Sequence, residues 1–175
     1  MSDYVAYDYS YDPDPPPANG DNGNNGSDDT TLTNVEFWPD VSLQDFRAAE
    51  RLRTDIPAAR LRHALEAALA LVNRLLTDFT LAQKKAGAES HADIERTSLQ
   101  RQDHYKTLYL RAVYASAHAD LLERYADYSA TGDTGGSTGS SRADMYQDAA
   151  AGYRRTMRWA LAEIEDRPHT TVELI

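Results

Sequence analysis

Histidines and carboxylates are the side chains of this sequence that could hold a metal ion. In a helical bundle, a two-metal carboxylate site needs Glu-x-x-His pairs, because a spacing of three residues places both ligands on one helix face. The residues three positions before the five histidines are Arg60, Ala88, Arg101, Ala115 and Asp166. None of them is Glu, and no His-Glu-x-x-His motif occurs. The sequence therefore predicts neither a metal site nor a cofactor.

Catalytic nucleophiles and phosphate-binding loops lack their usual sequence context. Glycines cluster between Gly132 and Gly139, but no Lys-Ser/Thr pair or preceding strand accompanies them, as a phosphate loop requires. The chain has no cysteine. It also lacks a nucleophile elbow, in which a strand leads directly into the turn that carries the serine. A Ser–His–Asp triad assembled by the fold is left open, but these patterns favour a protein that is not an enzyme.

Arginines form two clusters that could contact another subunit. The first comprises Arg47, Arg51, Arg53, Arg60 and Arg62, and the second comprises Arg154, Arg155 and Arg158. The simpler interpretation is that they are solvated or paired with nearby acids such as Glu50 and Glu163. Alternatively, they bind carboxylates of a neighbouring copy, because guanidinium pairs with carboxylate in a fixed bidentate geometry. Trp159 lies off the main apolar stripe and could anchor such an interface. The predicted interface residues are Arg60, Arg62, Arg155, Arg158 and Trp159.

The overall charge argues against general binding of nucleic acid. The 175 residues are 41% hydrophobic and carry a net charge of -10, and residues 1–40 contain no Lys or Arg. Nucleic-acid binding needs a basic footprint, and no apolar run is long enough to cross a membrane. The amino terminus also lacks the apolar core of a secretory signal. We expect one domain of a soluble, cytosolic type, with the acidity in a tail.

The first 35 residues are predicted to be an acidic arm. Tyrosines and aspartates alternate loosely from Tyr4 to Asp12, followed by four prolines and a Gly/Asn/Asp tract from Asn19 to Asp29. Such a segment has little apolar surface to offset its ordering entropy, so we expect it to be disordered in isolation. It is either a solubilising tail or an arm whose tyrosines dock in pockets of a partner.

Residues 36–168 are predicted to form an all-α domain, a small bundle of one short and three long helices. Ser42 is expected to cap the short helix, which runs to about Arg53. Asp55 should cap a long helix that includes Pro57 and ends at Gly87. The remaining two helices are expected over about 99–128, and over about 142–165 with Met145 turned inward. The connection between them, residues 129–141, is predicted to be a flexible loop.

The last residues, 169–175, are predicted to be a strand-like tail. Pro168 ends the preceding helix, since it lacks a backbone donor and biases Arg167 away from helix. The tail residues that follow are Thr170, Thr171, Val172, Glu173, Leu174 and Ile175. We find no second strand-like run in the chain, so the partner of this strand is expected in another molecule.

Several segments together resemble a known family. They are Trp38-Pro39-Asp40, Pro57-Ala58-Ala59-Arg60-Leu61-Arg62, Arg111-Ala112-Val113-Tyr114-Ala115, Leu122-Glu123-Arg124-Tyr125, Met157-Arg158-Trp159-Ala160 and Asp166-Arg167-Pro168. In this order and spacing, the chain resembles the head completion (head-stabilisation) or GPL family of P2-like contractile-tailed bacteriophages. The likeness covers about residues 36–175 and leaves the acidic arm outside.

The resemblance implies a structural head-to-tail connector of the virion. Such a protein would form a ring, expected to be dodecameric, beneath the portal after DNA packaging. It would retain the genome, with DNA only passing through the channel, and provide the platform for neck or tail proteins. Assembly would take place in the host cytoplasm, and the strand-like tail would bind the portal. Two alternatives stay open: a helical, nucleic-acid-binding packaging subunit associated with the terminase, and an assembly chaperone.

Overall fold

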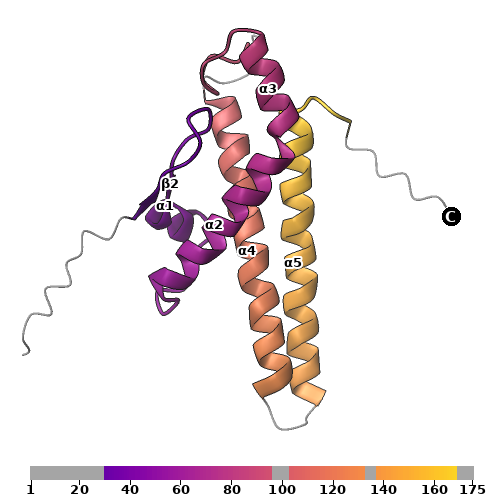
Figure 1. Cartoon of the computed structure of the whole chain (residues 1–175). Helices are drawn as coiled ribbons and strands as arrows, with labels where there is room; N and C mark the ends of the chain where they lie inside the picture. Colours follow the sequence, from indigo (N-terminus) through magenta and orange to yellow (C-terminus); the bar gives the residue numbers. More distant parts are fainter. Residues whose placement is uncertain (1–29, 96–102, 133–136, 169–175) are drawn as a thin grey trace, which may run out of the picture.

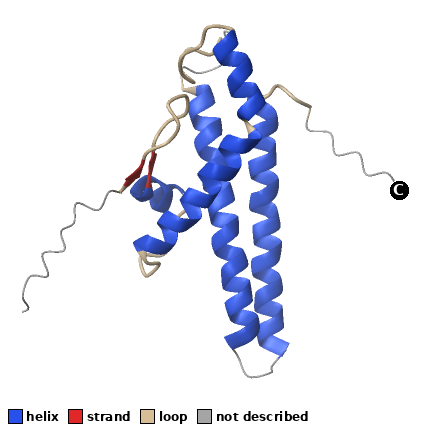
Figure 2. Ribbon diagram, viewed as in Figure 1, coloured by secondary structure: helices blue, strands red, loops and turns tan. Residues whose placement is uncertain are grey.

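Two long antiparallel helices, α4 (His104–Gly132) and α5 (Ser137–Ile164), form the axis of the molecule (Figure 1). The computed structural model describes residues 30–95, 103–132 and 137–168. In these residues it also contains helices α1 (Leu43–Ala49), α2 (Ala58–Leu75) and α3 (Thr77–Lys85), with strands β1 (Thr31–Leu32) and β2 (Val41–Ser42). The predicted all-α class is confirmed, because helices dominate and the two strands are very short (Figure 2).

Small buried side chains and an ion pair join α4 to α5. On α4 the alanines Ala112, Ala115 and Ala119 are buried, and such small residues let a neighbouring helix approach closely. On α5 the buried residues include Ala143, Ala150, Met157, Ala160, Leu161 and Ile164. Near the middle of the hairpin, Arg154 on α5 donates to both carboxylate oxygens of Glu123 on α4, at 3.1 and 2.7 Å.

Helix α2 crosses α4 obliquely and continues into α3 after a break at one residue (Figure 1). Its buried stripe is Leu61, Ala64, Leu65, Ala68, Leu69 and Val72. The sequence predicted one helix here, but Leu76 has φ −93° and ψ 8°, outside the helical region. The hydroxyl of Thr77 donates to the carbonyl of Asn73 at 3.0 Å, a contact that bends helices. Leu75, expected inward, is 45% exposed.

Helix α1 is preceded by a small β-hairpin. Thr31 pairs with Ser42 and Leu32 with Val41 in an antiparallel register. The expectation that the chain contains no second strand-like run was therefore wrong, because two-residue strands are too short to give an alternating pattern. Leu32 is buried in the core, so ordered structure begins before residue 36, the predicted start of the folded domain. The predicted cap of α1 is confirmed: the Ser42 hydroxyl accepts from the backbone N–H of Asp45 at 3.2 Å.

An aromatic cluster fixes the segment before α1 onto the helices. Trp38 is buried and stacks on Tyr109 of α4, with ring centroids 4.5 Å apart, and its indole N–H donates to Thr80 of α3. The hydroxyl of Tyr109 donates to Asn73, the Asn73 amide donates to Asn34, and the Asn34 amide donates back to that hydroxyl, all within 2.8 Å. This closed ring of hydrogen bonds satisfies three polar groups from separate parts of the chain.

Other expectations at the helix ends need correction. Asp55 does not cap α2, which begins after Pro57 without a side-chain cap, because the carboxylate of Asp55 binds Arg53. The predicted loop 129–141 is largely helical backbone, since α4 reaches Gly132 and α5 begins at Ser137. Met145 is 69% exposed, not inward. The predicted strand-like tail lies outside the described residues, as does most of the acidic arm.

Candidate interaction surfaces

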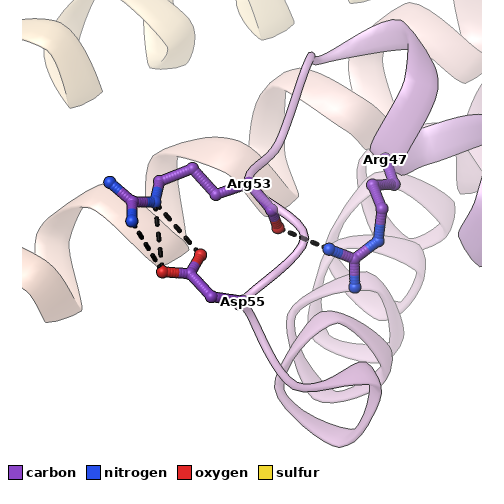
Figure 3. A network of polar contacts seen from close by, with 3 residues as sticks. All are labelled: Arg47, Arg53 and Asp55. Carbon is purple, nitrogen blue, oxygen red and sulfur yellow. Dashed lines mark hydrogen bonds and ion pairs between the residues drawn. The ribbon is translucent and has the colours of Figure 1, made fainter.

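The first basic cluster is partly used to build the turn between α1 and α2 (Figure 3). The Arg47 guanidinium donates to the carbonyl of Arg53, and to that of Ile56 at 2.8 Å. Arg53 and Asp55 form an exposed ion pair at 2.8 Å, and hydrogen bonding from Arg53 holds the pKa of the Asp55 carboxyl below its usual value. Arg53 is therefore paired with a nearby acid, as the simpler interpretation expected, whereas Arg47 binds backbone carbonyls of the turn.

Arg60 lies at a basic pocket in the angle between α2 and α4. Its guanidinium lies over the ring of Tyr125, 5.9 Å from the centroid. The pocket has a volume of about 640 Å³ and is lined by Arg60, His63, Arg124 and Tyr125. We call these four residues the basic pocket. Arg124 forms an ion pair with Asp120 at 2.9 Å, whereas no described carboxylate lies within ion-pair distance of Arg60.

Arg62 lies on a different flank of α2 from Arg60. It is half-buried and lines a second pocket of about 320 Å³ together with Arg47 and Thr30, next to α1. The structure therefore separates two arginines that the sequence grouped together. Positions two apart on a helix differ by about 200° around its axis, which places these side chains on different flanks.

The second arginine cluster, Arg154, Arg155 and Arg158, is also divided between internal and exposed positions. Arg154 is used internally, because it pairs with Glu123 of α4. Arg155 lies over the ring of Trp159 at 5.4 Å, and Trp159 is 46% exposed, as its position off the apolar stripe predicted. Arg158 is exposed on the same helix. The outer surface of α5 thus carries an exposed aromatic ring and two exposed arginines, and we call Arg155, Arg158 and Trp159 the α5 patch.

Glu50 pairs with a histidine rather than with an arginine. Its carboxylate lies 2.8 Å from Nδ1 of His118, and both side chains are largely shielded from solvent. The His118 ring packs on Tyr153, with centroids 4.1 Å apart. Burial, and then the carboxylate of Glu50, raises the pKa of Tyr153. These contacts fix the end of α1 to both α4 and α5, and therefore set the position of the turn that precedes α2.

Sequence reasoning missed three of the four residues of the basic pocket: His63, Arg124 and Tyr125. Tyr125 was predicted to lie on the inward stripe of its helix, and it is in fact half-buried and lines the pocket. No local pattern joins it to Arg60, because 65 positions separate them in the chain. The packing of α2 on α4 creates the pocket.

Two further observations concern the described part of the chain. No group of three or more His, Cys, Asp or Glu side chains there is arranged to hold a metal ion. None of the helices described has the length and apolar character needed to span a bilayer.

The fold and these surfaces define a small all-α protein, a long helical hairpin with cationic and aromatic surface patches. The profile of one family, the phage head completion protein (GPL), matches residues 32–175. The head completion/stabilization protein of Escherichia phage P2 is 32% identical over 150 residues, which is 85% of each chain. The probable head completion/stabilization protein of Haemophilus phage HP1 is 32% identical over 98 residues, 56% of this chain and 65% of the relative. No solved structure matches.

The chain therefore belongs to the phage head completion protein (GPL) family. The resemblance inferred from the sequence is confirmed, and it assigns the protein a structural role in assembly of the phage head.

Proposed function

We propose that the protein forms a ring beneath the portal after DNA packaging, retains the genome and provides the platform for neck and tail attachment. The observation that carries this proposal is the family match over residues 32–175, which spans the five helices of the described residues. The relatives are named head completion/stabilization proteins, and we propose that the part to be completed is the opening through which DNA enters the head. DNA itself would only pass through the channel.

Two different surfaces on separate helices are suited to ring formation. The basic pocket lies between α2 and α4, and the α5 patch lies on another helix. Both surfaces are cationic, so each would bind carboxylates on another face of the neighbouring subunit and not the other cationic surface. Such contacts between unlike surfaces are heterologous, and they generate a ring when the rotation closes. Trp159 is the natural anchor, because a half-exposed Trp held by an Arg loses little freedom when it becomes buried. We propose Arg60, Arg62, Arg155, Arg158 and Trp159 as subunit contacts.

The strand-like tail is proposed to bind the portal. Helix α5 ends at Ile164, and Asp166 adopts a left-handed conformation with φ 52°. The N–H of Arg167 then closes the helix end by donating to the carbonyl of Ala162 at 2.8 Å. The residues that follow, Thr170 to Ile175, would add as a strand to an exposed sheet edge, where main-chain hydrogen bonds give affinity.

Native mass spectrometry tests the ring, and a binding assay with purified portal tests the tail. We expect ring-sized assemblies of the full chain that are lost in Arg158→Glu and Trp159→Ala. Asp144→Asn is the control, since it changes an exposed charge of α5 away from the patch. Deleting residues 170–175 should abolish portal binding and leave the helical circular dichroism spectrum unchanged. Intact rings in both patch variants, or full portal binding without the tail, would contradict the corresponding part.

A further inference from the structure

The basic pocket and the surface next to it carry more positive than negative charge. Tyr125 lines the basic pocket and also an adjoining pocket of about 350 Å³ that includes Arg51 and Arg53. Together with Tyr125, the two pockets are lined by four arginines, Arg51, Arg53, Arg60 and Arg124, and by two carboxylates, Glu50 and Asp55. The Glu50 carboxylate is already bound to His118. Asp55 neutralises Arg53 and Asp120 neutralises Arg124. Within the described residues, Arg51 and Arg60 have no carboxylate at ion-pair distance, so two cations are left exposed beside an aromatic ring.

The amino-terminal segment has the complementary composition. Residues 1–29 contain seven aspartates, four tyrosines and no Lys or Arg. A guanidinium binds a carboxylate along its edge and an aromatic ring on its face, and both groups alternate between Asp3 and Asp12. Arg60 already uses this second mode with Tyr125. The segment therefore carries both of the groups that these arginines bind.

The described chain begins close to the basic pocket, so the amino-terminal segment is within reach of these arginines. Thr30 lines the pocket on the other flank of α2, beside Ala58 and Arg62. The width of one helix, about 10–12 Å, separates this flank from the basic pocket. Twenty-nine residues can span up to roughly 95 Å when extended. A tether of this kind gives an effective concentration in the millimolar range, so individually weak exposed ion pairs are sufficient.

We propose that residues 1–29 bind the basic pocket of their own chain in the free subunit, with aspartates on Arg60 and Arg51 and a tyrosine packed beside Tyr125. This inference goes beyond ring formation and does not depend on it, because the contact is made within one chain.

Photo-crosslinking within the full-length protein tests the contact. Benzoylphenylalanine replaces Tyr7, and unlabelled chains are mixed with equal amounts of isotope-labelled chains before irradiation and mass spectrometry. We expect crosslinks from position 7 to residues 58–66 and 120–127. Each crosslink should join two peptides that are both unlabelled or both labelled, because the contact lies within one chain. Replacing Asp3, Asp8, Asp12 and Asp14 with Asn should lower their yield, as should increasing salt.

A matched pair of arginine variants makes the test specific. Arg60→Glu should reduce the crosslink yield about five-fold or more, since it replaces an attraction with a repulsion. Arg74→Glu is the control, because Arg74 is also an exposed arginine of α2 but lies in the last turn of that helix, far from Arg60. Circular dichroism verifies that both variants keep their helices. Crosslinks that join unlabelled to labelled chains, that map elsewhere, or that persist undiminished in Arg60→Glu would each overturn the proposal.

Discussion

Trp38 lies face to face with Tyr109, with ring centroids 4.5 Å apart and planes inclined by 8°. Phe79 and His91 stack near the same indole, at 6.4 and 6.2 Å. Residues from four distant parts of the chain therefore meet at one side chain. This arrangement makes the segment before α1 an integral part of the fold.

The two tryptophans of the chain should respond very differently to truncation. Trp38 is 3% exposed and Trp159 is 46% exposed. Trp38→Ala leaves a large cavity and should lower the free energy of unfolding by about 3–5 kcal/mol. Trp159→Ala should lower it by less than about 1 kcal/mol. Urea denaturation followed by circular dichroism measures both, and similar losses in the two variants would contradict this assignment.

Removing the hydroxyl of Tyr109 should break the ring of hydrogen bonds with Asn34 and Asn73. Tyr109→Phe keeps the stacking but leaves two shielded amide groups each without one partner, so we expect a loss of about 1–3 kcal/mol in unfolding free energy. Tyr125→Phe is the control, because its hydroxyl makes no hydrogen bond with the described residues. An unchanged urea midpoint in Tyr109→Phe would show that water replaces the lost hydrogen bonds.

Stability should fall in alkaline solution because of buried tyrosines. Burial raises the pKa of Tyr109 to about 12, and burial, with Asp45 and Glu50 nearby, raises that of Tyr114 to about 12. In the unfolded chain both ionise near pH 10, so their stabilising effect is complete below about pH 10 and is lost as the pH rises toward about 12. Urea midpoints at about pH 9 and about pH 11 measure the loss, which should be smaller in Tyr109→Phe.

The pair of Glu50 and His118 should show energetic coupling. Their side chains are only 18% and 13% exposed, and the contact joins α1 to α4. A double-mutant cycle with Glu50→Gln and His118→Ala should give about 1–2 kcal/mol near neutral pH, as expected for a shielded hydrogen bond to a charged group. The more exposed pair of Asp120 and Arg124 serves as comparison and should give less than about 0.5 kcal/mol. Equal coupling in the two pairs would argue against shielding as the cause.

Two glycines should respond to alanine with opposite signs. Gly87 has φ 101°, which strains any side chain, whereas Gly152 lies within α5 and has open space around its Cα. Gly152→Ala should raise the unfolding free energy by about 0.5–1 kcal/mol. Gly87→Ala should lower it by about 1 kcal/mol or more. Thermal unfolding of the two variants measures the signs.

Local rules of sequence were sufficient for much of the fold. The apolar stripe of α2 from Leu61 to Val72, the Ser42 cap and the stop at Gly87 depend on residues within a few positions of one another. Their spacing therefore predicts them. The ordered set of segments from Trp38 to Pro168 likewise predicted the family. Local rules failed where a competing contact was available, as for Asp55, which binds Arg53, and Thr77, which binds Asn73 and bends the helix.

The sequence by itself determined that the protein is helical, where its acidity lies and which family it belongs to. Only the tertiary structure decided which arginines are available to a partner. It uses Arg47 and Arg154 internally, and it places Arg60 and Arg62 on different flanks of one helix. The reason is physical: periodicity reports which side of a helix is apolar, but a pocket such as that of Arg60 and Tyr125 exists only once two helices have packed at a particular angle.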